Sequence, residues 1–371
     1  MNISIIGGGP AGLYFASSVK MLNPSFDVTI YEARNESVNS FGLGYTLQKL
    51  NTSLLERLDK NYFKGIFPEG PGPLITDALF KSHNNQRVLD FSDGYSIKRS
   101  NLMDYLSAKA HSLGVKVKEK KITLINLKRL QRSSDLLVGA DGINSVVRRH
   151  YSSKLNAQTK KAKLKFSWFI NETEQVRKEA CFYSFKAPEG VVMLTSYPLT
   201  ENKQVVIIEM TDKCQNSGNF KGKSPEQASE YLSEILSQNG DQIQLKSAGL
   251  PWYSFIMNTT KKLNHQNVTL IGDAAYSYHY SAGQGVTMAF TMGFTLAQCI
   301  QKNTDFSSAL NHYNNAVQLF SKKPAKESVM VINWLEKVDH YFESTDDSEL
   351  LDLFIKKHNF ETKLALDDNA A

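Results

Sequence analysis

A glycine-rich turn between an apolar run and a helix-forming segment opens this sequence and limits its fold more than any other feature. The apolar run covers residues 2–6, and the helix-forming segment covers 13–22 and ends before Pro24. The turn fits the spacing GxGxxG through Gly7, Gly9 and Gly12. The first glycine of such a turn allows the tight bend, the second lets backbone approach a pyrophosphate, and the third lets the helix pack closely on the strand. We therefore predict the start of a Rossmann-like, dinucleotide-binding fold.

A second predicted strand, residues 27–31, ends in an acid that supports the same site. Glu32 lies twenty residues after Gly12, where a carboxylate can bind the hydroxyls of a ribose. An acid at this position favours an unphosphorylated ribose, as in FAD or NAD, over NADP. A glycine-rich turn without a ligand is the alternative interpretation. The nucleotide-binding candidates in this region are Gly7, Gly9, Pro10, Ala11, Gly12, Glu32, Ala33 and Arg34.

Two later apolar runs each close on a glycine beside a carboxylate. Residues 135–147 read DLLVGADGINSVV and place Asp141 after an apolar strand. Residues 267–275 read NVTLIGDAA and place Gly272 and Asp273 in the same way. Carboxylates just past strand ends are well placed to bind ribityl hydroxyls. Each segment alone could be an ordinary strand–turn–helix, and Asp141 could be a helix cap.

A second glycine-rich turn follows, with Gly283 and Gly285 before an apolar helix over residues 286–300. These glycines would let backbone N–H groups reach a planar ring or a phosphate, with the helix N-terminus behind them.

In this order and at these separations, the three motifs resemble the FAD-dependent aromatic monooxygenases of the para-hydroxybenzoate hydroxylase type, the class A flavoprotein hydroxylases. The resemblance covers nearly the whole chain. It implies FAD as cofactor, NAD(P)H as a transient electron donor, and transfer of oxygen from a flavin C4a-hydroperoxide to an electron-rich aromatic ring. No His or Cys stands at a position suited to covalent attachment, so we expect FAD to be bound noncovalently. Arg99 begins a segment similar to the family's arginine-bearing helix beside the flavin, and RxxL at a surface helix start is the alternative.

The late glycine turn departs from the commonest form of the family, because Tyr276, Tyr280 and Thr287 stand where that form has His, Pro and Asn. It is similar instead to a narrower subgroup that contains the violacein-pathway tryptophan hydroxylase and the hydroxylases of salicyloyl- or anthraniloyl-coenzyme A. The stretch around Gly44 points the same way, and Gly44 is a further cofactor-binding candidate. The substrate expected from this subgroup is indole- or tryptophan-like, or an aryl-coenzyme A.

His279 is the candidate catalytic residue, because its position before the late glycine turn would bring a proton donor close to the flavin ring. A buried structural histidine is the alternative. Phe166 and Trp168 alternate with period two on one predicted strand and could form either core or an aromatic substrate wall. The remaining substrate candidates are Trp252, Tyr253 and Tyr280, each of which could instead be packing.

The predicted fold class is mixed α/β, with a discontinuous Rossmann-like FAD-binding domain and an inserted β-sheet domain. We place the FAD-binding domain at 1–75, 96–155 and 258–330. The substrate-binding domain would then comprise 76–95 and 156–257, and residues 331–371 would form a C-terminal helical cap. Lysine-rich stretches at 115–129 and 154–165 are interpreted as solvated strand faces or loops.

Composition limits the partners. A formal charge of +6 over 371 residues gives little support to nucleic-acid binding, and no apolar run is long enough to span a membrane. Three separated cysteines and the histidine spacing predict no disulfide framework and no metal site. We expect a cytoplasmic monomer or weak dimer that uses an aromatic substrate, O2 and NAD(P)H. A flavoenzyme of halogenase-like, N-hydroxylating or drug-inactivating chemistry, or a flavin-binding interaction protein, is the alternative.

Overall fold

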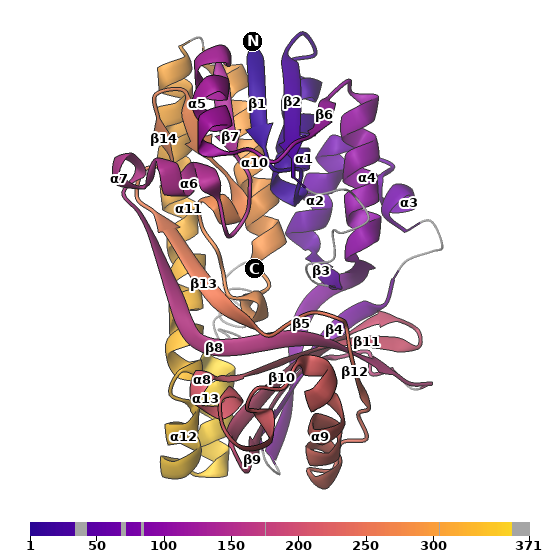
Figure 1. Ribbon diagram of the computed structural model, residues 1–371. Helices are drawn as coiled ribbons and strands as arrows, with labels where there is room; N and C mark the ends of the chain where they lie inside the picture. The colour runs from indigo at the N-terminus through magenta and orange to yellow at the C-terminus, as the bar shows by residue number, and fades with distance from the viewer. Residues whose placement is uncertain (34–42, 68–71, 83–84, 175, 304, 358–371) are drawn as a thin grey trace, which may run out of the picture.

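The chain folds around two β-sheets, which lie one above the other in Figure 1. This computed structural model describes residues 1–33, 43–67, 72–82, 85–174, 176–303 and 305–357. The six-stranded sheet and its helices occupy the upper part of the view, and the nine-stranded sheet crosses the lower part. The predicted mixed α/β class is confirmed. No helix in the described ranges is long and apolar enough to cross a membrane.

The six-stranded sheet is parallel except at one edge, where β14 runs antiparallel to β15. Its strands, in spatial order, are β14 (Asn264–His265), β15 (Val268–Leu270), β7 (Leu136–Gly139), β1 (Asn2–Ile6), β2 (Asp27–Glu32) and β6 (Lys116–Glu119). The chain leaves β1 toward β2 on one side and returns as β7 on the other. Ligands bind at such switch points, at the carboxyl ends of the strands. The carboxyl ends of β1, β7 and β15 therefore bring all three motifs together.

Helices surround the six-stranded sheet, and α1 and α10 cross closely behind it. The helices of this part are α1 (Pro10–Leu22), α2 (Lys49–Leu58), α3 (Tyr62–Ile66), α4 (Arg99–Ser112), α5 (Leu124–Ser133), α6 (Val146–His150), α7 (Ser152–Leu155) and α10 (Gly285–Lys302). The rings of Tyr14 and Phe290 stack at 4.5 Å between centroids. A Cβ atom at Gly293 would lie 3.3 Å from Phe15, so glycine permits this close crossing.

The nine-stranded sheet is antiparallel apart from the pairing of β4 with β9. Its strands, in spatial order, are β12 (Leu245–Ser247), β8 (Ala157–Glu172), β11 (Lys203–Thr211), β10 (Gly190–Thr200), β9 (Ala180–Ala187), β4 (Leu74–Ser82), β5 (Asn85–Lys98) and β3 (Gly44–Gln48), with β13 (Tyr253–Thr260) pairing with β8. Val205 and Ile207 belong to one apolar cluster, and Val206 and Ile208 belong to another. Both faces of the sheet are therefore covered.

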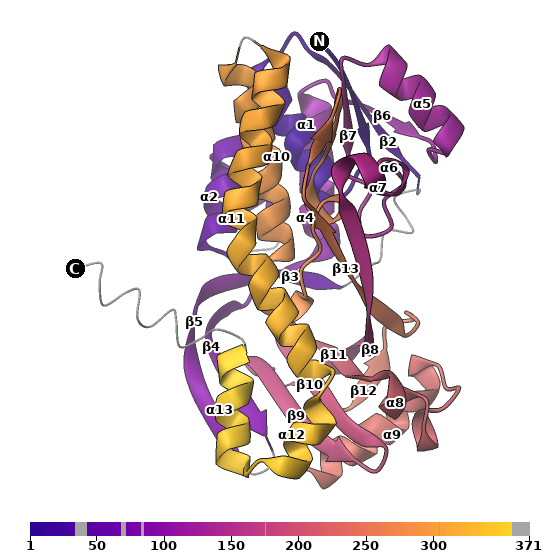
Figure 2. The same cartoon turned by 90° about the vertical axis from the view of Figure 1, so that its left-hand side faces the viewer.

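Different helices cover the two faces. The face with Val206 and Ile208 packs against α9 (Pro225–Gln238), with α8 (Asp212–Gln215) and the 3-10 turn Gly218–Phe220 nearby. The face with Ile207 packs against the C-terminal helices α11 (Phe306–Leu335), α12 (Val338–Ser344) and α13 (Asp347–Lys357). Figure 2 shows α11 running along both parts of the molecule.

Several elements match the sequence-based expectations and others do not. The strand predicted over 27–31 is β2, and the helix predicted over 286–300 lies within α10. A reciprocal capping box of Ser224 and Gln227 begins α9 at Pro225. The stretch 115–129, predicted as solvated strand faces or loops, contains the exposed strand β6, as expected, but also the start of α5, which buries Leu127. β3 pairs with β5 in the nine-stranded sheet, although it lies in the range 1–75 expected for the FAD-binding domain. The domain boundaries remain a prediction.

Candidate active site

The first glycine turn is shaped by packing at two glycines and open at the third. Gly7 has φ +105°, and a Cβ atom there would lie 2.3 Å from the carbonyl oxygen of Ala140. A Cβ at Gly12 would lie 2.1 Å from the carbonyl oxygen of Gly7. A Cβ at Gly9 would meet nothing within 4 Å. Gly9 also begins α1 without a side-chain cap, so the helix N-terminus can face a phosphate there.

The same glycines bring the three motifs together. Gly7 packs against Asp141, whose Cα atom would lie 2.8 Å from a Cβ on Gly7. Gly272, with φ +59°, packs against Ala11, and a Cβ there would lie 2.8 Å from the Ala11 methyl group. Residues more than 250 positions apart in the chain thus form one surface at the ends of β1, β7 and β15.

Glu32, at the end of β2, is tied to the glycine turn. The backbone N–H of Gly8 donates a hydrogen bond to Glu32 Oε2 at 2.6 Å. The carboxylate therefore lies beside the turn, where it can meet a ribose. Ala33 follows it and is exposed, whereas Arg34 lies outside the described residues.

Replacing Glu32 with alanine is expected to weaken FAD binding about ten- to hundredfold, because one or two charge-assisted hydrogen bonds are lost. Glu119→Ala is the matched control, since Glu119 is exposed and lies beside Glu32 in the β2–β6 register. Fluorescence quenching of FAD on titration with each variant measures the affinity. Equal affinities for both variants would show that Glu32 is only a strand-end residue.

Asp141 is both a helix cap and an open ligand position. Its Oδ2 accepts hydrogen bonds from the backbone N–H groups of Val146 at 2.6 Å and Val147 at 3.3 Å. Its Oδ1 is buried and has no hydrogen-bond partner among the described residues. Burial raises the pKa of this carboxyl, although its hydrogen bonds lower it. The free oxygen fits a ligand that supplies a hydroxyl donor, as FAD would.

Arg148 connects the turn that follows Asp141 with the turn that contains Gly272 and Asp273. The sequence did not indicate this role. Its guanidinium is buried and donates to the carbonyl oxygens of Ile143, Asp273 and Ala274, at 2.7, 3.4 and 3.1 Å respectively. Burial lowers the pKa of Arg148, and the nearby carboxylates of Asp141 and Asp273 raise it. Arg148 therefore holds both motif turns in place.

Asp273 follows β15 and interacts electrostatically with Arg99 and Arg148. Its side chain is exposed, yet the surrounding protein desolvates it enough to raise the pKa from 3.8 to about 6, while Arg99 and then Arg148 lower it. Arg99 begins α4, and its guanidinium lies 5.4 Å from the ring centroid of Tyr45. The positive charge of Arg99 therefore acts on the Asp273 carboxylate, and both residues are predicted to bind the cofactor.

This pKa shift predicts a pH-dependent cost in the FAD-free protein. The folded state binds the Asp273 proton more tightly than the unfolded state, so stability falls as pH rises between 3.8 and about 6. Asp273→Asn should remove that fall and leave the apoprotein more stable than wild type above it. Solvent screening keeps the difference small. Melting temperatures measured across this pH range test it, and parallel profiles for the two proteins would contradict it.

The second glycine turn ends at the N-terminus of α10. Gly283 has φ +65°, which favours glycine, and Gly285 is the first residue of the helix. Gly44 begins β3, and Gln48, the last residue of that strand, lies beside Gly283. A Cβ at Gly44 would lie 2.8 Å from the backbone carbonyl oxygen of Ile97, and the Gly44 carbonyl oxygen accepts a hydrogen bond from the Tyr197 hydroxyl at 3.0 Å. Gly44 is therefore required by packing between sheet strands.

Four of the five predicted substrate residues gather at one face of the nine-stranded sheet. Phe166 lies 5.2 Å from Trp168, 5.4 Å from Tyr280 and 6.1 Å from Tyr253 between ring centroids. The prediction that Phe166 and Trp168 share one strand face is confirmed. The prediction that Trp252 belongs to this group is wrong. Its ring packs with Phe169 on the opposite face, and its indole N–H donates to the Lys223 carbonyl oxygen. Adjacent residues of an extended chain point to opposite faces, so Trp252 and Tyr253 separate.

His279 is fully buried, and both ring nitrogens have protein partners. Nε2 lies 3.0 Å from Glu209 Oε1, and Nδ1 lies 2.9 Å from Ser281 Oγ. The Ser328 hydroxyl accepts a hydrogen bond from the His279 backbone N–H. This position is a correction to the expectation that His279 itself meets the substrate, because its side chain has no accessible surface. Tyr280 is partly accessible instead, and its hydroxyl donates to Glu209 Oε2 at 2.8 Å.

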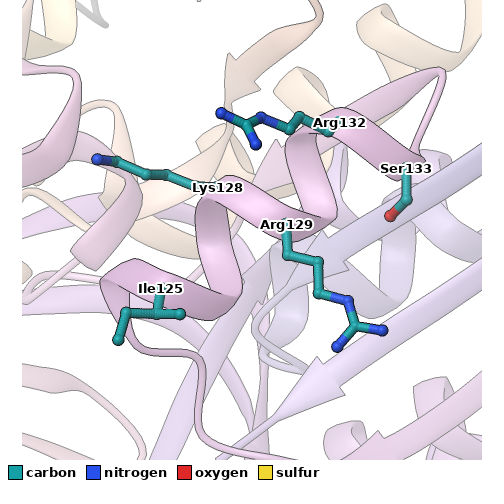
Figure 3. A pocket seen from close by; sticks show the side chains of 5 residues that line it. All are labelled: Ile125, Lys128, Arg129, Arg132 and Ser133. Carbon is teal, nitrogen blue, oxygen red and sulfur yellow. The ribbon is translucent and has the colours of Figure 1, made fainter.

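A hollow on the surface lies elsewhere, on α5. It is lined by Ile125, Lys128, Arg129, Arg132 and Ser133. Figure 3 shows that Lys128 and Arg129 project to opposite sides of the helix, so the charges do not converge on one point. None of the predicted site residues lines it. The strand edge with the glycine turns remains the candidate active site.

The fold and the residues at the carboxyl ends of β1, β2, β7 and β15 define a dinucleotide-binding protein. Its glycine turn suits a pyrophosphate, its Glu32 carboxylate suits a ribose, and its Asp141 oxygen suits a hydroxyl donor. The chain belongs to the family described as FAD binding domain, which matches residues 103–336. The predictions of FAD as cofactor and of this family are confirmed.

Known relatives cover most of the chain. Salicyloyl-CoA 5-hydroxylase from Streptomyces sp is 24% identical over 93% of this chain and 67% of that protein. Protodeoxyviolaceinate monooxygenase from Chromobacterium violaceum is 24% identical over 91% of this chain and 90% of that protein. The solved structure of 2-methyl-3-hydroxypyridine-5-carboxylic acid oxygenase superposes with a TM-score of 0.70 at 20% identity, over 92% of this chain and 93% of that one.

Proposed function

We propose that this protein is an FAD-dependent monooxygenase that uses NAD(P)H and O2 to hydroxylate an electron-rich aromatic metabolite. The substrate class that fits best is indole- or tryptophan-like, or an aryl-coenzyme A. The observation that carries the proposal is the aromatic group formed by Phe166, Trp168, Tyr253 and Tyr280 beside the glycine turn that leads into α10. Relatives named as aromatic hydroxylases support it.

Bound FAD would supply the redox chemistry, and the chain supplies position and environment. The first glycine turn and Glu32 would hold the nucleotide end, and Asp141 and Asp273 would hold ribityl hydroxyls. Tyr253 and Tyr280, the partly accessible rings of this group, would contact an aromatic substrate beside the flavin, with the buried rings of Phe166 and Trp168 behind them. Apolar walls around this position would exclude water, so that reducing equivalents are used on the substrate.

A screen of candidate substrates tests the proposal. FAD-loaded protein is mixed with NADH or NADPH and with indoles, anthranilates or aryl-coenzyme A thioesters, and NAD(P)H oxidation, organic product and H2O2 are measured together. The proposal expects one substrate class to stimulate oxidation and to give product in proportion. A product that requires chloride would favour halogenase-like chemistry. Oxidation that yields H2O2 without an organic product from any compound would contradict the proposal.

A further inference from the structure

Glu209 is a buried carboxylate on the face of the sheet that carries the aromatic group. It is 3% exposed, and its cross-strand neighbours in the register are Phe166 of β8 and Met193 of β10. Both neighbours belong to the apolar cluster on that face. A buried carboxylate in apolar surroundings is costly unless hydrogen-bond donors satisfy it. The side chains that donate hydrogen bonds to Glu209 therefore affect which ligands the site can bind.

Two side chains satisfy this carboxylate, one on each oxygen. His279 Nε2 lies 3.0 Å from Oε1, and the Tyr280 hydroxyl lies 2.8 Å from Oε2. The backbone N–H of Ser281 points at His279 Nδ1, at 3.4 Å, which makes Nδ1 the acceptor nitrogen. We therefore assign the proton to Nε2, which donates it to Glu209. His279 acts as a positioning residue that fixes Glu209.

The Tyr280 hydroxyl has one proton, and Glu209 takes it. A phenolic oxygen that donates its proton can only accept further hydrogen bonds. Tyr280 is partly accessible, packs against Phe166 and lies just before Gly283 and α10. Glu209 thus sets the direction of the hydrogen bond that Tyr280 can offer to a molecule beside the aromatic group.

We propose that the Glu209–Tyr280 pair selects substrates that present an N–H or O–H donor, such as a ring hydroxyl, amino group or indole N–H, and disfavours those that present only an acceptor. The inference rests on the proposed function, because it takes the aromatic group as the substrate site. The pair determines which ligands bind and takes no part in proton transfer. Glu209 contacts His279 and Tyr280, with Phe166 and Met193 flanking it from the neighbouring strands.

Glu209→Gln should invert this preference. The glutamine carbonyl oxygen would still accept from His279, and its amide NH2 would then donate to the Tyr280 oxygen. The Tyr280 proton would be released to point at the ligand. Tyr280→Phe should remove the preference instead, because no polar group remains. Glu201→Gln, in the exposed turn between β10 and β11, is the matched control for loss of one carboxylate.

The test compares ligand pairs that differ only by methylation of the donor: phenol with anisole, aniline with N,N-dimethylaniline, and indole with 1-methylindole. Dissociation constants come from the change in flavin absorbance or fluorescence of the FAD-loaded protein, and melting temperatures check the fold of each variant. Wild type and Glu201→Gln should bind the donor member about five- to a hundredfold more tightly. The dissociation constant of the methylated member divided by that of the donor member should fall to about one in Tyr280→Phe and below one in Glu209→Gln.

The outcomes separate this inference from the proposed function. A ratio that is the same in wild type and both site variants would show that methyl bulk, and not Tyr280, sets the preference, and would overturn the inference alone. A panel in which no aromatic compound perturbs the flavin of wild type would overturn the proposed aromatic site and this inference with it. If Glu209→Gln does not fold, Tyr280→Phe alone decides, because an unchanged ratio there excludes Tyr280 as the contact.

Discussion

Replacing Gly9 with valine is expected to abolish tight FAD binding while leaving the FAD-free protein folded. The backbone of Gly9 has φ −75° and ψ −177°, which valine adopts readily, and no protein atom stands within 4 Å of its Cβ position. The side chain would instead occupy the approach to the helix N-terminus. Losing two charge-assisted hydrogen bonds to a pyrophosphate should weaken binding by about two to four orders of magnitude. FAD content and the melting temperature of the apoprotein measure the two effects.

Gly12→Val is the matched counterpart, with the opposite expected pattern. Its Cβ would lie 2.1 Å from the Gly7 carbonyl oxygen, and that backbone cannot move without disturbing β1 and α1. We expect this variant to lose its fold, with or without FAD. If Gly9→Val keeps the wild-type affinity, the turn does not meet the pyrophosphate, and the placement of FAD at this strand edge is wrong.

Arg148→Met should produce a large loss of stability. The substitution keeps an apolar stem of similar length but removes the donor of the buried Ala274 carbonyl oxygen, while Asn258 Nδ2 still donates to the Ile143 and Asp273 carbonyl oxygens. One unsatisfied buried carbonyl oxygen, together with the lost charge-assisted hydrogen bonds, is expected to lower the free energy of unfolding by roughly 1–3 kcal/mol. Chemical denaturation measures the change.

Arg149→Met is the control, since Arg149 is exposed on the same short helix and should change stability by less than about 0.5 kcal/mol. A similar, small effect at both positions would mean that Arg148 does not hold the two motif turns together.

The sequence alone predicts how the three motifs meet, because the physics involved is local. Each motif is a strand followed by a glycine or carboxylate turn, and the carboxyl ends of parallel strands share one edge. Glu32, Asp141 and Asp273 can therefore be assigned to one surface from the residue pattern. Phe166 and Trp168 follow from the two-residue period of a strand.

Other parts of the site depend on tertiary pairing and leave no local signal. Glu209 lies 70 residues from His279, in a strand that contains the run VVIIEMT, and nothing in that run identifies His279 and Tyr280 as its partners. Its one signal is a carboxylate within an otherwise apolar strand. Trp252 differs from Tyr253 only in which face its side chain takes, and the start of β13 decides that. Arg148 bonds to backbone carbonyls, whose positions no sequence pattern encodes.

The central claim, an FAD-dependent oxygen transfer to an aromatic ring, is tested most directly with isotopically labelled dioxygen. FAD-loaded protein, NAD(P)H, labelled O2 and the aromatic compound that best stimulates oxidation are incubated together, and the product is examined by mass spectrometry. The proposed function predicts a product that carries one labelled oxygen atom. A product with oxygen from water only, or labelled H2O2 as the sole oxidised species, would contradict it.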